Sequence, residues 1–188
     1  PRSTQSRSSA ASDVYKRQAE GVTDRRLAVG PVQEGNYKQV GAGCLAYGHI
    51  AIASTPIDIN LAKQLNILLS NLGVSPDNIL IDPTTGGLGY GLEYSFSVME
   101  RVRQAALTQK DDKLQFPLYS NLGKEVWKVK EAKLSAEEAP QLGDPEKRGV
   151  LMEALTANVA LCAGADVVVL RHPESAKLVR WLIDELLN

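Results

Sequence analysis

The sequence predicts an α/β fold, an incomplete TIM (β/α)8 barrel with about five βα units. Residues 19–188 repeat one pattern: a short β-rich run, a turn rich in Gly, Pro, Thr and Asn, and a segment whose apolar residues recur three and four apart. The strand runs are almost continuously apolar, which is typical of a parallel sheet covered by helices. A complete barrel has about 250 residues, or about 32 per unit, so residues 19–188 correspond to about five units.

Residues 1–18 are left out of this predicted fold. They are rich in Ser, Lys and Arg and contain almost no apolar residue that could pack in a core. Transit peptides have such a composition, and the segment also resembles translated adapter sequence at the broken end of an assembled sequence. We therefore expect residues 1–18 to be non-native or disordered and residues 19–188 to form the C-terminal part of the barrel.

Three strands and two helices are expected in the first half of the chain. The strands are predicted at residues 27–29, 50–53 and 79–81, and the first helix at residues 36–47. The second helix carries an apolar stripe at Leu61, Leu65, Leu68 and Leu72. It should end at Gly73, because glycine suits the left-handed position that follows a helix. Pro83 ends the third strand, since proline cannot donate to a strand ladder.

The second half continues the alternation with one irregular insertion. A helix is predicted from the apolar face of Leu92, Phe96, Met99, Val102 and Ala106, followed by a weaker strand at residues 116–119. Residues 122–148 read as a charged, exposed insertion with a short helix around Trp127. The chain then continues through a helix carrying Leu151, Leu155, Val159 and Cys162, a strand at residues 167–170, and a last helix with Leu178, Trp181, Leu182 and Leu186 on one face.

An open doubly wound sheet is the alternative fold. Such a sheet normally carries a phosphate-binding glycine turn after its first strand. Residues 41–46, GAGCLA, match the loose form of that motif, but no apolar strand precedes them and too few residues separate them from the next strand. We interpret them as a helix face of small residues.

Charge and composition exclude several classes of partner. Lys and Arg number 21 against 22 Asp and Glu, for a net charge of −1, so no surplus of positive charge favours nucleic acid or an anionic membrane. No run approaches the roughly 20 apolar residues that span a bilayer, and a cytoplasmic location is expected. The two cysteines, Cys44 and Cys162, lack metal-ligand spacing, so we expect them to be buried and expect no metal site or iron–sulfur cluster on this chain.

The most informative segment is residues 82–101, DPTTGGLGYGLEYSFSVMER. Its glycines, Gly86 and Gly87 among them, could let the backbone approach a bulky flat ligand. Thr84, Thr85 and Tyr90 offer hydroxyl groups without adding charge. An equally good interpretation is the start of a helix, in which Thr84 or Thr85 caps and the glycines relieve strain.

A family resemblance extends over essentially everything after Ala19. Residues 82–103, together with residues 57–66 (IDINLAKQLN), 121–132 (NLGKEVWKVKEA), 164–166 and 172–175, closely resemble the small (delta) subunit of the corrinoid iron–sulfur protein of the acetyl-CoA decarbonylase/synthase complex. In that family the small subunit is a (β/α)8 barrel. The large (gamma) subunit carries the [4Fe–4S] cluster and most of the corrinoid-binding surface.

The resemblance implies a role in the reductive acetyl-CoA pathway. A methyl group passes from a methylated tetrahydropterin or tetrahydrofolate to cob(I)amide and then to acetyl-CoA synthase. This chain would be a non-catalytic subunit of the enzyme complex that seats a corrinoid shared with the large subunit, with the methyltransferase and acetyl-CoA synthase as transient partners. Cob(I)amide is itself a powerful nucleophile, so the protein need not supply a base. The protein has only to hydrogen-bond the amide side chains of the macrocycle, and uncharged groups at the ends of the strands can do so. The candidate corrinoid-binding residues are Thr55, Thr84, Thr85, Gly86, Gly87, Tyr90, Ser120 and Asn121.

A freestanding pterin-dependent methyltransferase of the same barrel family is the alternative function. Asp58, Asn60 and Asp82 could bind a pterin ring there. Asp58 could equally cap the helix that begins near Asn60, and Asp82 could bond the backbone of its own turn. A Schiff-base aldolase is set aside, because none of the predicted strands ends in Lys.

His49, His172 and Trp127 each have a structural interpretation as well as a functional one. His49 precedes its strand, at the end of a barrel where residues serve stability. His172 follows the fifth strand, and we favour the start of a helix or a partner contact over a cobalt ligand. Trp127 lies in a charged run, and such runs usually form a solvent-exposed face. The alternative interpretation is that Trp127 contacts the large subunit.

Overall fold

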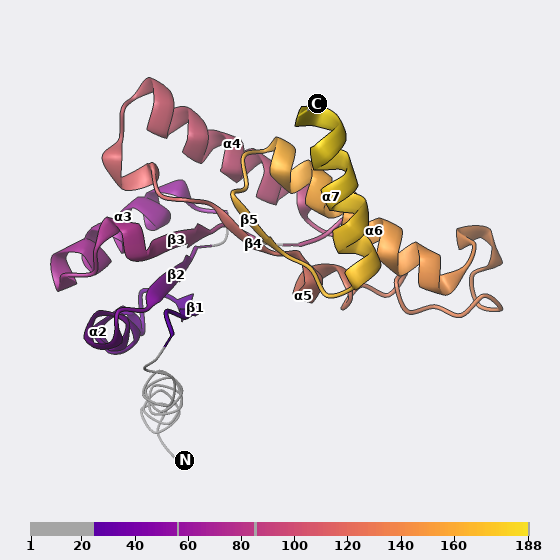
Figure 1. Ribbon diagram of the computed structural model, residues 1–188, viewed down its shortest axis with the longest axis horizontal. Coiled ribbons are helices and arrows are strands. Elements are labelled where there is room, and N and C mark those ends of the chain that lie inside the picture. The colour runs from indigo at the N-terminus through magenta and orange to yellow at the C-terminus, as the bar shows by residue number, and fades with distance from the viewer. Residues whose placement is uncertain (1–24, 56, 85, 188) are drawn as a thin grey trace, which may run out of the picture. The chain divides into compact units, whose positions relative to one another are not determined.

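The structure, a computed structural model, describes residues 25–55, 57–84 and 86–187 as alternating strands and helices (Figure 1). The chain forms two compact units. The first comprises the chain up to Asp82 together with Val102–Pro117, and the second comprises Pro83–Arg101 and Leu118–Asn188. Residues 1–18, expected to be non-native, lie outside the described residues.

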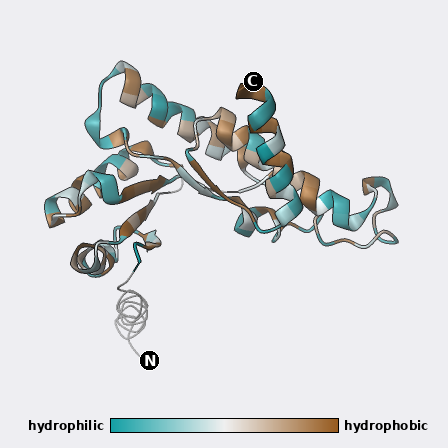
Figure 2. Ribbon diagram, viewed as in Figure 1, coloured by the Kyte–Doolittle hydropathy of each residue, from teal (hydrophilic) through white to brown (hydrophobic). Residues whose placement is uncertain are grey.

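The first unit contains a parallel sheet of three strands in the order β1-β2-β3. The strands are β1 (Ala28–Val32), β2 (Ile50–Ser54) and β3 (Ile79–Asp82), and each is joined to the next through a helix, α2 (Tyr37–Tyr47) or α3 (Ile59–Leu72). In the register of β2 and β3, Ala53 pairs with Ile81 and Ser54 with Asp82. Strands β2 and β3 are strongly hydrophobic (Figure 2), and Ala53 and Ile81 are fully buried. The predicted parallel βα arrangement is confirmed.

The predicted small-residue face lies on α2. A Cβ atom built on Gly41 would lie 2.8 Å from Cδ2 of Leu72 and 2.9 Å from Cδ2 of Leu69, both on α3. A larger residue at this position would require the ends of these two leucine side chains to shift, so Gly41 favours the close packing of the two helices. The predicted apolar stripe of α3 is rotated in the structure. Leu65 is buried as expected, but Ala62, Asn66 and Leu69 complete the buried face, and Leu61, Leu68 and Leu72 are half-buried.

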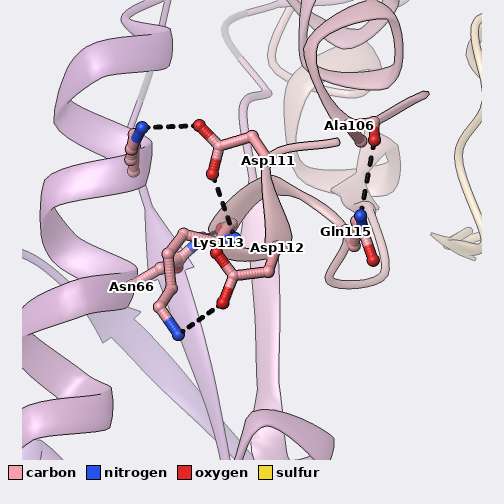
Figure 3. A network of polar contacts seen from close by, with 7 residues as sticks. Asn66, Ala106, Asp111, Asp112, Lys113 and Gln115 are labelled. Carbon is pink, nitrogen blue, oxygen red and sulfur yellow. Dashed lines mark hydrogen bonds and ion pairs between the residues drawn. The ribbon is translucent and has the colours of Figure 1, made fainter. Parts of the chain in front are cut away.

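A short 3-10 turn, η2 (Asp112–Leu114), is tied to α3 by polar contacts (Figure 3). The Asn66 side-chain amide donates to the backbone carbonyl of Lys113 at 2.7 Å. Lys63 forms an ion pair with Asp111 at 2.6 Å, and the same Asp111 caps the turn by accepting from the Lys113 backbone N–H. These contacts fix the segment before the next strand.

The second unit contains the parallel pair β4 (Tyr119–Asn121) and β5 (Val167–Val169), with Ser120 opposite Val168. Its helices are α5 (Leu122–Val126), α6 (Pro145–Cys162) and α7 (Pro173–Leu187), together with the first part of α4 (Leu92–Thr108). Strand β4 begins later than the predicted strand at residues 116–119. Phe116 is buried without being part of the ladder, and Pro117 has no N–H to donate, so the apolar run indicated burial rather than the strand itself.

The buried faces of α6 and α7 differ from the predicted ones. Leu151 and Leu155 of α6 are 52% and 51% exposed, whereas the small residues Ala154, Ala157 and Ala160 are buried. On α7 the predicted face of Leu178, Trp181, Leu182 and Leu186 is half-buried to exposed, and the helix buries Ser175 and Val179 instead. Small residues let a helix approach its neighbours closely, so they, and not the leucines, form the packed face.

The insertion after α5 is less exposed than predicted. Val129, Ala132 and Ala139 are buried in it. The guanidinium of Arg148, itself 7% exposed, donates to the backbone carbonyls of Glu131, Leu134, Leu142 and Gly143 at 2.8–3.1 Å. One side chain of α6 thereby holds the irregular chain in place.

The two cysteines differ. Cys44 is buried, as expected, and burial raises the pKa of its thiol to about 11. Cys162, the last residue of α6, is exposed, so the expectation that it is buried is wrong. Among the described helices, none has the length and apolar character that crossing a membrane requires.

Candidate functional site

Two of the predicted site residues meet at the ends of strands in the first unit. Thr55 follows β2, and its backbone N–H donates to the carbonyl of Asp82, the last residue of β3, at 3.0 Å. Thr55 is 2% exposed, and its hydroxyl has no hydrogen-bond partner among the described residues. Parallel pairing of β2 and β3 therefore brings Thr55 and Asp82 to the same edge of the sheet, as predicted.

Asp58 and Asn60 begin the helix that follows. The Asp58 carboxylate accepts from the backbone N–H groups of Asn60 at 2.8 Å and Leu61 at 3.1 Å, and so caps α3. The helix-capping interpretation of Asp58 is the one that the structure shows. Asn60 lies in the first turn of α3 and is exposed.

The glycines of the loop before α4 approach the chain itself. A Cβ atom on Gly86 would lie 1.7 Å from the carbonyl oxygen of Tyr90, and one on Gly87 would lie 2.9 Å from Cγ2 of Val126. Both glycines are buried, and Thr84 is half-buried. Thr85 lies outside the described residues. The loop requires glycine at these two positions to fold back on itself and to pack on α5.

Two hydrogen bonds fasten this loop to other elements of the second unit. The backbone N–H of Leu88 donates to the hydroxyl of Thr156 on α6 at 3.2 Å, and the hydroxyl of Tyr90 donates to the Glu131 carboxylate at 2.5 Å. The bond between Tyr90 and Glu131 raises the pKa of Tyr90 and lowers the pKa of Glu131. Tyr90 is nevertheless 51% exposed, so the loop presents an aromatic hydroxyl in a fixed position.

Ser120 and Asn121 form the end of β4. Ser120 is fully buried, and its hydroxyl has no partner among the described residues. The side-chain carbonyl of Asn121 accepts from the backbone N–H of Lys124 at 3.3 Å and caps α5. Asn121 also lines a cavity of about 480 Å³.

This cavity, called the basic pocket below, lies at the carboxyl ends of β4 and β5. Besides Asn121 and Trp127, it is lined by four positively charged residues, Lys124, Lys128, Lys133 and Arg171. The sequence does not mark these four as site residues, because a run of alternating charges after a strand usually indicates a solvated face. The sequence signal that could have found them is the cluster of three lysines within the twelve residues after a strand end, with an arginine after the next strand.

Trp127 lines the basic pocket, and Glu153 holds the backbone of Arg171 and His172 beside it. The Arg171 guanidinium lies 5.6 Å from the centre of the Trp127 ring, and the His172 ring stacks on Trp127 at 6.0 Å. The fully buried carboxylate of Glu153 accepts from the backbone N–H groups of Arg171 at 2.6 Å and His172 at 3.0 Å. A Cβ atom on Gly149 would lie 2.6 Å from the Trp127 ring, so this glycine makes room for the indole.

Both histidines have structural contacts. His172 Nδ1 accepts from the backbone N–H of Glu174 at 3.2 Å, which places His172 at the start of α7, as favoured from the sequence. His49 is fully buried before β2, and its Nδ1 accepts from the backbone N–H of Leu27 at 3.3 Å. Within residues 25–55, 57–84 and 86–187, no group of His, Cys, Asp and Glu side chains is arranged to hold a metal ion.

Comparison with solved structures supports the fold. Dihydropteroate synthase from Clostridium difficile, in the presence of pteroic acid, aligns with a TM-score of 0.58 and 15% identity over 93% of this chain and 64% of that one. Dihydropteroate synthase from Stenotrophomonas maltophilia aligns with a TM-score of 0.58 and 14% identity over 94% of this chain and 67% of that one. These proteins are TIM barrels, so the chain is part of an α/β barrel, as predicted.

Comparison with curated proteins identifies the family. The delta subunit of the acetyl-CoA decarbonylase/synthase complex from Methanopyrus kandleri is 35% identical over 168 residues, covering 89% of this chain and 41% of the relative. The corresponding subunit from Archaeoglobus fulgidus is 33% identical over 172 residues, covering 89% of this chain and 37% of the relative. The chain thus spans about two fifths of the length of these relatives.

A family model described as the CO dehydrogenase/acetyl-CoA synthase delta subunit matches residues 7–183. The match covers nearly the whole chain and agrees with the resemblance carried by residues 82–103 and 121–132. The chain belongs to the family of CO dehydrogenase/acetyl-CoA synthase delta subunits.

Proposed function

We propose that this chain is a corrinoid-seating subunit in the transfer of a methyl group from a methylated tetrahydropterin or tetrahydrofolate to acetyl-CoA synthase. The bound corrinoid would supply the cobalt that accepts and passes on the methyl group. Membership of the delta-subunit family supports a role in the acetyl-CoA decarbonylase/synthase complex. The large subunit of the corrinoid iron–sulfur protein would be the stable partner, and the methyltransferase and acetyl-CoA synthase would be transient ones.

The observation that carries the proposal is the fixed, uncharged hydroxyl of Tyr90. A corrinoid is a flat macrocycle edged with neutral amide side chains, which call for neutral donors and acceptors in fixed positions. Tyr90 offers an acceptor on a loop fastened to α5, α6 and Glu131, because the hydroxyl donates its proton to Glu131 and its oxygen can still accept. Ser120 and Asn121 add a buried hydroxyl and an amide at the end of β4 in the same unit.

The residues of this chain would bind and orient the macrocycle, and we assign no catalytic residue to it. The glycines would act indirectly. Gly86 and Gly87 allow the backbone path that presents Tyr90, whereas Tyr90 itself would contact the corrinoid. Larger residues at either glycine would break the loop, so their loss would not separate a folding defect from a binding defect.

The test therefore removes one hydroxyl, together with its bond to Glu131, and keeps both glycines and the bond from Leu88 to Thr156 that also fastens the loop. We expect Tyr90→Phe, in the protein assembled with the large subunit, to weaken corrinoid binding by about threefold to tenfold, the effect of one hydrogen bond. Tyr94→Phe is the matched control, because Tyr94 is similarly exposed, at 56%, and lies nearby in the chain. Retained corrinoid is measured by its visible absorbance after gel filtration. Equal retention by the Tyr90→Phe variant and the wild type would contradict the proposal.

A freestanding pterin-dependent methyltransferase is the competing outcome. Of its candidate residues, Asp82 stands at the end of β3 beside Thr55, while the carboxylate of Asp58 is engaged by two backbone N–H groups. Titration of the protein with methyltetrahydrofolate, without the large subunit, separates the two functions. Tight binding that is lost in Asp82→Asn would favour the methyltransferase over the corrinoid-seating subunit.

A further inference from the structure

The basic pocket of the second unit concentrates positive charge in a chain whose net charge is −1. Lys124 lies on α5, Lys128 and Lys133 lie in the segment that follows it, and Arg171 follows β5. These three segments bring four cationic side chains to a cavity of about 480 Å³ whose lining contains no carboxylate. Such a concentration of one sign of charge in a concave site attracts anions.

Nearby carboxylates leave most of this charge unneutralised. Lys128 forms an ion pair with Glu125. Among the described residues, no carboxylate forms an ion pair with Lys124, Lys133 or the Arg171 guanidinium. Glu153 instead accepts from the backbone of Arg171 and His172. Three cations therefore remain to bind a ligand.

The arginine is held in position by its surroundings. Two hydrogen bonds from the backbone to buried Glu153 fix residues 171 and 172, and the guanidinium lies over the Trp127 ring. Gly123 lets α5 lie close to the backbone of Arg171, because a Cβ atom at position 123 would lie 2.8 Å from the backbone nitrogen of Arg171. A side chain held before the ligand arrives loses less conformational entropy on binding.

We propose that the basic pocket binds a multiply charged phosphate group carried by an organic molecule. Lysine ammonium groups act as point charges that can reach a tetrahedral phosphate from several directions, and arginine can bind two of its oxygens at once. The cavity is within the size range of small-molecule sites and exceeds what a phosphate group alone fills. Val169 and Leu170 supply an apolar surface for the rest of the molecule. This site shares Asn121 with the proposed corrinoid contacts but differs from them in its four cations, which neutral amides do not require.

Isothermal titration of the purified protein with pyrophosphate and with ADP tests the proposal. Pyrophosphate represents the free anion, and ADP carries the same diphosphate group on an organic molecule. Citrate is a carboxylate anion and serves for comparison. We expect pyrophosphate and ADP to bind at the same site, with ADP at least as tight, and both tighter than citrate. Lys124→Gln and Lys133→Gln should each weaken binding about tenfold or more, because each removes a charge-assisted hydrogen bond.

Lys130→Gln is the matched control. Lys130 is exposed in the same segment but does not line the basic pocket, so this variant should bind as the wild type does. Lys124 and Lys133 are also exposed, so the variants should fold, which thermal unfolding verifies. Absence of pyrophosphate and ADP binding at millimolar concentration would overturn the proposal. Citrate binding as tight as that of pyrophosphate, or equal weakening by Lys130→Gln, would also overturn it.

Discussion

Glu153 is a fully buried carboxylate that accepts from the backbone N–H groups of Arg171 and His172. Removing it would leave both part-buried N–H groups without this acceptor. We expect Glu153→Ala to lower the free energy of unfolding by about 2–4 kcal/mol, the penalty for unsatisfied buried groups. Glu153→Gln should cost less, because one side-chain oxygen remains to accept.

Urea unfolding followed by circular dichroism measures this effect. Glu146→Ala on the same helix is the control, because Glu146 is exposed and its loss should change stability by less than about 0.5 kcal/mol. Equal unfolding midpoints for Glu153→Ala and Glu146→Ala would show that the Glu153 hydrogen bonds contribute nothing.

The two cysteines should differ sharply in reactivity. The pKa of Cys44 is raised to about 11 by burial, so its reactive thiolate appears only as the pH rises toward that value. At pH 8 the thiolate fraction is about 0.1%, and burial blocks access besides. Cys162 is exposed. We expect a disulfide reagent to label one thiol per chain quickly at pH 8 and the second only after unfolding.

Cys162→Ser identifies the fast thiol. The fast phase should vanish in this variant, while Cys44→Ser should retain it. Rapid labelling of both thiols in the folded protein would mean that Cys44 is accessible.

Single residues differ in how far the sequence predicts their role. Asp58 could be identified as a helix cap because its partners are the backbone N–H groups two and three positions on. The role of Glu153 could not be predicted, since its partners are backbone groups 18 and 19 residues away. Backbone groups carry no sequence signature, and only the fold brings them together.

At the scale of elements, Arg148 organises the insertion between α5 and α6. Its guanidinium donates to four backbone carbonyls, and no carboxylate partner is needed. Arg148→Lys keeps the charge but loses the planar fork of donors. We expect this variant to lower the free energy of unfolding by about 3 kcal/mol and to open the insertion to proteases.

Limited proteolysis with mass spectrometry locates the opening. New cleavage sites should fall between residues 128 and 144. Lys147→Ala is the control, because Lys147 is the exposed neighbour of Arg148 and should leave the cleavage pattern unchanged. A pattern in Arg148→Lys identical to that of the wild type would show that the four hydrogen bonds do not hold the insertion.

The sequence predicted the order of elements better than the faces they bury. The strands β2 and β3 and the end of α3 at Gly73 follow from local features: continuous apolar runs and a glycine in the left-handed conformation, with φ of 101°. The buried faces of α6 and α7 do not follow from hydrophobicity. There, close packing selects Ala157 and Ser175 over Leu155 and Trp181.

At the scale of the whole molecule, the five-unit α/β organisation was predictable because it depends on repeated spacing. The candidate site was predictable only in part. Residues at strand ends, such as Thr55 and Asn121, follow from the parallel topology. The basic pocket depends on Lys124 and Lys133 converging with Arg171, and their separation in the sequence hides that convergence.

The cysteine content of the chain bears on whether it can hold an iron–sulfur cluster. A [4Fe–4S] cluster is held by four cysteine thiolates, and this sequence has two cysteines. The buried one, Cys44, belongs to no group of possible metal ligands among the described residues. We therefore expect the purified protein, separated from any partner subunit, to contain no stoichiometric iron. Its melting temperature should be the same with and without EDTA, because a metal bound only by the folded state would stabilise it.

Elemental analysis and thermal unfolding with and without the chelator check both statements. A sample assembled with the large subunit serves as the comparison, since a cluster held by that partner raises the iron content of the complex without changing this chain. One iron or more per separated chain, together with a lower melting temperature in EDTA, would require a metal site that the described residues do not form. Iron that appears only in the assembled sample would place the cluster on the partner, and this chain would then contribute shape and hydrogen bonds rather than redox chemistry.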